Sequence, residues 1–194
     1  MFHRAHLAEF LGTFVLALGV AISIAFVLPL ATPLLAAMIL GLFVYTLGHV
    51  SGAHFNPAVT IGLLTAKKIK STDAMMYILA QILGALAALI ICRFFITNTQ
   101  LLAGENTLKM AAGEIVGTAI FTFGVMSVVT KKVHANLSGI VIGFSLLLGI
   151  IFASTMSNGI LNPAVALTIG FSPVDVVGQI IGGIIGVQLY KAIC

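Results

Sequence analysis

Charged residues are scarce in this chain. They make up 7% of its 194 residues, whereas a soluble domain usually carries about 25%. Hydrophobic residues account for 60% of the sequence, and the mean hydropathy is +1.21. This composition offers too little polar surface for water. It therefore excludes an ordinary soluble domain and predicts an all-α protein that crosses a membrane several times.

Acidic residues and cysteines are also few. Five Asp and Glu stand against nine Lys and Arg, and in a membrane protein such an excess reports loop orientation rather than nucleic-acid binding. The two cysteines, Cys92 and Cys194, have no metal-binding spacing. The sequence also shows no recognisable combination of a nucleophile with a general base. The sequence therefore predicts no enzyme, no cofactor, no metal site and no nucleic-acid partner.

Six apolar stretches are long enough to cross a bilayer, which needs about 20 residues per helix. They cover residues 5–28, 34–52, 73–96, 110–130, 137–156 and 175–193. Two shorter apolar stretches, 56–66 and 162–171, are about 15 Å long as helices. Because this is half a membrane, we predict two re-entrant half-helices in addition to the six transmembrane helices.

The triplet Asn-Pro-Ala begins each half-helix. Its two copies are Asn56, Pro57, Ala58 and Asn162, Pro163, Ala164. Asn suits a helix N-cap and Pro suits the first helical turn, although both are unfavourable inside a long helix. We expect the triplets to cap the half-helices and to direct spare asparagine amide hydrogens into a shared lumen.

The pattern of spans and half-helices occurs twice. Glu9 and Glu114 begin matching Glu-x-x-Gly-Thr stretches, and the triplets follow at separations that agree to one residue. Each unit, about 1–96 and about 107–194, has three full spans, and an odd number of crossings inverts the second copy. The sequence therefore predicts one domain, residues 1–194, with an inverted repeat and with the two triplets meeting near the midplane.

Basic residues indicate the orientation. Seven of the nine fall on one predicted side of the membrane: Arg4, Lys67, Lys68, Lys70, Lys131, Lys132 and Lys191. The positive-inside rule then places both termini in the cytoplasm. We expect a multi-pass protein of the cell membrane.

Polar residues in or beside the spans are expected to hold the half-helix loops. Glu9 and Glu114 lie at matching depths where a free charge is expensive, so each should accept hydrogen bonds from loop backbone. His54 and Gln81 are expected to bond the first loop, although His54 also suits a pH-sensitive constriction and Gln81 the pore wall. The alternative is a proton- or ion-coupled transporter that uses both Glu residues.

The converging half-helices favour a pore for small uncharged solutes. Each helix N-terminus carries about half a positive charge. A neutral molecule accepts hydrogen bonds from the asparagine amides, whereas a cation meets positive potential and a dehydration cost. A junctional or structural membrane protein with a poorly conducting pore is a third alternative.

These residues resemble the aquaporin family, also called the major intrinsic proteins. The most specific part of the match is Ser51–Thr60, and the Glu9, Ala80-Gln81 and Glu114 positions are also similar to the family pattern. The resemblance spans essentially the whole chain and implies a homotetramer with one pore in each subunit. It also implies passage of water and, in some branches, glycerol, urea, ammonia, hydrogen peroxide or metalloid acids.

The sequence departs from the family at its narrow filter, which four positions outside the triplets build. The resemblance assigns them to Ala36, Ile150, Gly159 and Val165, and Val165 stands where the family usually has Arg. Ala166 replaces the Asp of typical glycerol facilitators. A filter without guanidinium or imidazole is expected to be wide and apolar, so it also risks losing water and conducting poorly.

Val165→Arg is expected to lower the permeability to urea, hydrogen peroxide and glycerol while water flow stays measurable. The guanidinium adds both bulk and positive charge at the filter. Flux measurements on proteoliposomes check each solute. Unchanged solute flux would contradict the assignment of Val165 to the filter.

Overall fold

The structure is a computed structural model that describes residues 3–26, 28–96, 102 and 106–194. Within these residues the fold is helical throughout and contains no strand. The helices are α1 (Arg4–Ala25), α2 (Thr32–Ser51), α3 (Pro57–Thr65), α4 (Ser71–Phe95), α5 (Leu108–Val129), the 3₁₀ turn η1 (Ala135–Leu137), α6 (Ser138–Ala153), α7 (Pro163–Ile169) and α8 (Pro173–Ile193).

Six helices in the described part of the chain are long and apolar enough to cross a membrane: α1, α2, α4, α5, α6 with η1, and α8. The six predicted spans are therefore confirmed, with their ends shifted by at most three residues. The shifts arise because hydropathy measures apolar length, whereas capping residues set helix ends. For example, α8 begins at Pro173 because the Ser172 side chain accepts a hydrogen bond from the Asp175 backbone N–H.

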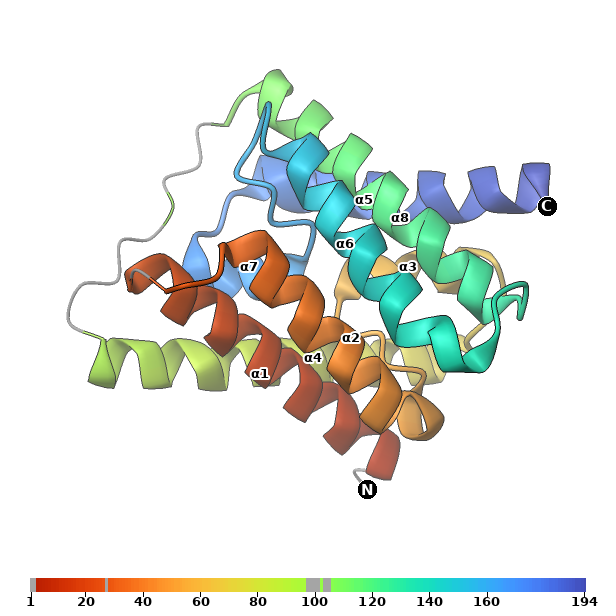
Figure 1. The fold of residues 1–194 in the computed structure, drawn as a ribbon, viewed down its shortest axis with the longest axis horizontal. Helices are drawn as coiled ribbons and strands as arrows, with labels where there is room; N and C mark the ends of the chain where they lie inside the picture. Colours follow the sequence, from red (N-terminus) through yellow and green to blue (C-terminus); the bar gives the residue numbers. More distant parts are fainter. Residues whose placement is uncertain (1–2, 27, 97–101, 103–105) are drawn as a thin grey trace.

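The helices pair in the same way in both halves of the chain. α1 packs against α2 and α4, and α5 packs against α6 and α8. α2 and α6 join the halves, while α3 packs against α8 and α7 packs against α4. Each short helix thus lies against the last long helix of the other half. Figure 1 shows α3 and α7 in the middle of the bundle, surrounded by the long helices.

Two contacts between the halves bring helix backbones together. A Cβ atom placed on Gly41 of α2 would lie 2.8 Å from the carbonyl oxygen of Gly139 at the start of α6. One placed on Gly62 of α3 would lie 2.6 Å from the carbonyl oxygen of Gly183 in α8. In lipid the hydrophobic effect does not drive helices together, so such close packing of small residues holds the halves in place.

Gly186→Ala is expected to destabilise the fold by about 1–3 kcal/mol, because the new methyl would overlap the Ala119 carbonyl oxygen and the Thr122 hydroxyl on α5. Gly48→Ala is the matched control, since its Cβ would meet only the Val44 side chain at 3.9 Å. Thermal unfolding in detergent compares the two variants with the parent chain. Equal unfolding temperatures for both variants would contradict the packing described at α5 and α8.

Candidate functional site

Each Asn-Pro-Ala triplet caps a short helix in the structure. Asn56 is extended, and its side-chain oxygen accepts a hydrogen bond from the Ala58 N–H at 2.8 Å. Asn162 is also extended and accepts from the Ala164 N–H at 3.0 Å. Proline follows each cap in the first helical turn, where it interrupts no helical hydrogen bond. The half-helices therefore start at the triplets.

The two caps bond each other's loops. The Asn56 amide donates to the Leu161 carbonyl at 2.8 Å, and the Asn162 amide donates to the Phe55 carbonyl at 2.9 Å. Phe55 and Leu161 both have positive φ, of 48° and 56°, a conformation that bulky residues adopt only under constraint. This reciprocal pair joins the N-terminal ends of α3 and α7. One hydrogen of each asparagine amide is used in the pair.

Glu9 of α1 accepts four hydrogen bonds from around the first loop. Its Oε1 atom accepts from the Ser51 hydroxyl at 2.6 Å and from the His54 N–H at 3.0 Å. Its Oε2 atom accepts from the Phe55 N–H and from the Gln81 amide, both at 2.7 Å. The carboxyl group is fully buried, so its desolvation is offset by these donors.

Glu114 of α5 repeats this arrangement around the second loop. Its Oε1 atom accepts from the Ser157 hydroxyl at 2.8 Å and from the Ile160 N–H at 3.0 Å. Its Oε2 atom accepts from the Leu161 N–H at 2.8 Å and from the Gln179 amide at 2.9 Å. The donors occupy matching positions in the two halves. The same chemistry therefore orders both loops.

The first loop has further partners. Gln81 donates to the Thr60 hydroxyl at 3.0 Å as well as to the carboxylate. The His54 ring lies 3.1 Å from that hydroxyl and packs edge-on against Tyr77. The Tyr77 hydroxyl donates to the Ser51 carbonyl at 2.8 Å. These contacts tie the loop to both α3 and α4.

Among the described residues, the second loop has no counterpart of the tyrosine contact. Asp175 occupies the position on α8 that Tyr77 occupies on α4, four residues before the matching glutamine. It is fully buried, and neither carboxyl oxygen has a hydrogen-bond partner among the residues that the structure describes. The Asn158 amide nitrogen also lacks a partner within that part of the chain. The two loops are otherwise matched, but they therefore differ in the hydrogen bonds that hold them.

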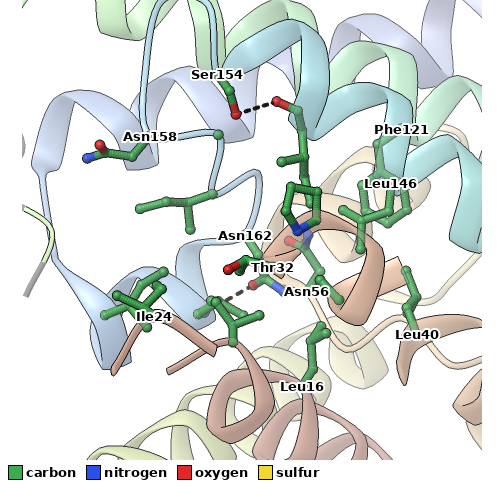
Figure 2. A pocket seen from close by; sticks show the side chains of 18 of the residues that line it. Leu16, Ile24, Thr32, Leu40, Asn56, Phe121, Leu146, Ser154, Asn158 and Asn162 are labelled. Atoms are coloured by element: carbon green, nitrogen blue, oxygen red, sulfur yellow. Dashed lines mark hydrogen bonds between the residues drawn. The ribbon is translucent and has the colours of Figure 1, made fainter. Parts of the chain in front are cut away.

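A cavity of about 260 Å³ reaches both capping asparagines. Ala36, Ile150, Gly159 and Val165, the four predicted filter residues, all lie on its wall. Its polar lining residues are Thr32, His54, Asn56, Ser154, Asn158 and Asn162, and no charged residue of the described chain lines it. Figure 2 shows Asn56 and Asn162 side by side at its centre. The lining can therefore donate hydrogen bonds but carries no formal charge.

The structure separates the predicted residues into two groups. The asparagines, the four filter residues and His54 line the cavity. The other predicted residues are buried away from its wall: Glu9, Gln81, Glu114, Pro57, Ala58, Pro163 and Ala164. Sequence reasoning missed the contacts of Tyr77 and Gln179. The repeat pairs Gln179 with Gln81 and could have revealed it, but a tyrosine bonded to a backbone carbonyl leaves no recognisable pattern.

Comparison with known proteins identifies the family. A match to the family described as "Major intrinsic protein" spans residues 1–190. The chain belongs to the major intrinsic protein family. Glycerol uptake facilitator protein-like 6 of Lactiplantibacillus plantarum is 37% identical over 83% of the chain and 80% of its own length. Human Aquaporin-1 is 31% identical over 100% of the chain and 82% of its own length.

A solved structure of the family has the same fold. The X-ray structure of the aquaglyceroporin from Plasmodium falciparum superposes with a TM-score of 0.72 at 22% sequence identity. The match covers 98% of this chain and 96% of that one. The major intrinsic protein fold, with six long helices and two half-helices, therefore extends over essentially the whole chain.

Glu114→Gln is expected to destabilise this member of the family by about 2–5 kcal/mol. The substitution places an amide nitrogen where a carboxylate oxygen accepts hydrogen bonds, so one buried backbone N–H, that of Ile160 or that of Leu161, loses its acceptor. Asp73→Asn, on an exposed carboxyl group in the first turn of α4, is the control. Thermal unfolding in detergent measures both. A Glu114→Gln protein as stable as the control would show that the carboxylate does not hold the loop.

Proposed function

We propose that the chain forms a passive channel for water and small uncharged solutes. The observation that carries the proposal is the reciprocal bonding of Asn56 and Asn162 at a cavity whose described lining carries no charge. Each amide group has a second hydrogen that a solute oxygen or nitrogen can accept. A neutral solute therefore exchanges bonds with water for bonds with the amides. A cation finds no carboxylate to replace its hydration shell.

The walls outside the asparagines support a wide, apolar filter at Ala36, Ile150, Gly159 and Val165. The side chains of Ala36 and Val165 and the backbone of Gly159 occupy little volume at the cavity wall. Such a wall passes solutes larger than water, and we propose urea, ammonia, hydrogen peroxide and glycerol as candidates. The name of the Lactiplantibacillus relative, a glycerol uptake facilitator-like protein, agrees with the last of these.

Glu9, Glu114, Gln81 and His54 are proposed to hold the loops in shape rather than to carry protons. Each carboxyl group accepts four hydrogen bonds, two at each oxygen, so both oxygens are already engaged by the loop and its neighbours. Neither carboxylate lines the cavity. A coupled transporter using Glu9 and Glu114 is therefore the less favoured alternative. The proposal needs neither an enzymatic reaction nor a cofactor.

We propose further that residues 1–194 form a single channel domain of two inverted units, about 1–96 and about 107–194. Both termini are proposed to be cytoplasmic, because seven of nine basic residues fall on that predicted side. The protein is proposed to act in the cell membrane as a homotetramer. The oligomer is supported by its family membership, and native mass spectrometry of the detergent-solubilised protein tests it.

Proteoliposomes containing the protein are expected to shrink faster than protein-free liposomes in stopped-flow light scattering after an osmotic step. Influx of glycerol, urea and ammonia is measured in the same preparation. A pH gradient is expected to drive none of these solutes above its equilibrium concentration. Uphill accumulation would favour the coupled transporter, and no flux above protein-free liposomes would favour a structural membrane protein.

A further inference from the structure

Four bulky apolar side chains surround one side of the paired asparagines. They are Leu16 of α1, Leu40 of α2, Phe121 of α5 and Leu146 of α6, and all four line the cavity. Each is at most 5% exposed. Figure 2 shows them in an arc that faces Asn56 and Asn162. We call these four residues the central collar.

The collar consists of two pairs of repeat partners, and the two members of one pair have different side chains. Leu40 and Leu146 each lie eleven residues before the serine that bonds its loop's glutamate, so they are repeat partners. Leu16 and Phe121 each lie seven residues after that glutamate. Phe121 therefore places a phenyl ring where its repeat partner, Leu16, has a leucine side chain. Phe121 is the largest side chain in the collar.

The filter residues build the outer wall of the cavity, and this wall cannot narrow the pore to the same extent as the collar. A Cβ atom on Gly159 would lie 2.6 Å from the Ser154 hydroxyl, and the residue has a φ of +64°, so larger residues are disfavoured there. Ala36 and Val165 are also small. Ile150 is the one filter residue with as many side-chain carbons as leucine, so the wall that the four residues build is lined mainly by small groups, whereas every collar residue carries at least four side-chain carbons.

We propose that the central collar, and Phe121 in particular, sets the size limit for solutes in this pore. A solute at this level has amide donors on one side and only hydrocarbon on the other. It must therefore pass in single file and present its acceptor atoms toward the asparagines. Polyols, with polar groups on every carbon, are slowed most because the ring offers no partner for their remaining hydroxyls. This inference rests on the proposed channel function.

The test compares glycerol with water permeability in proteoliposomes. Phe121→Leu introduces the residue found at the partner position and is expected to raise the glycerol-to-water permeability ratio by about threefold or more. Phe123→Leu makes the same change on the same helix, where the ring packs against Tyr190 at a centroid distance of 5.0 Å and does not line the cavity. It is expected to leave the ratio at the parent value.

Leu16→Phe makes the opposite change, from leucine to phenylalanine. It keeps the proposal testable if the Phe121→Leu protein does not fold. A second ring in the collar is expected to lower the glycerol-to-water ratio. Val165→Ala widens the pore at the outer wall and tests whether the filter, rather than the collar, sets the size limit. A larger rise in the ratio from Val165→Ala than from Phe121→Leu would overturn the proposal, as would an unchanged ratio in both collar variants.

The outcomes also separate this proposal from the channel function. If the parent protein conducts water but the collar variants leave the glycerol-to-water ratio unchanged, the channel function stands and the size limit at Phe121 is overturned. A parent protein without water flux above protein-free liposomes overturns both. Size-exclusion profiles and thermal unfolding temperatures of the variants show that each comparison is made on folded protein.

Discussion

The fold depends on satisfying the backbone of two non-helical loops inside a membrane. Hydrocarbon offers no hydrogen bonds, so the N–H and C=O groups in these loops need partners in the protein or in a water-filled cavity. Glu9 and Glu114 supply carboxylate acceptors, and Asn56 and Asn162 supply amide donors across the centre. Without these four side chains the half-helices would have no defined starting point, and the cavity between them would have no fixed wall.

Much of the architecture could be predicted because it follows from length and periodicity. Six apolar stretches of about 20 residues specify six crossings, and two triplets in matched register specify where the short helices begin. Asn56 and Asn162 could be placed together because an inverted repeat brings equivalent positions to a common axis. The predicted positions of the helix ends are less accurate, since single hydrogen bonds from caps such as Ser172 determine where a helix begins.

The remaining details of the site depend on distances that a linear pattern does not contain. The Tyr77 contact is to a backbone carbonyl, which any residue could supply. The burial of the Asp175 carboxyl group, which has no hydrogen-bond partner among the residues that the structure describes, becomes visible only in three dimensions. Phe121 reads as one more apolar residue in a membrane span until the structure shows that it lines the cavity. Packing, rather than composition, distinguishes these residues.

The glycine contacts between the halves have a mechanical consequence. Transport by alternating access requires one half to rock against the other, so that the site opens to each side in turn. Here the halves meet backbone to backbone at Gly41 with Gly139 and at Gly62 with Gly183, and the asparagine pair joins them in between. Rocking would have to separate all three junctions together. These contacts favour a fixed aperture, through which a solute can move without rocking of the two halves.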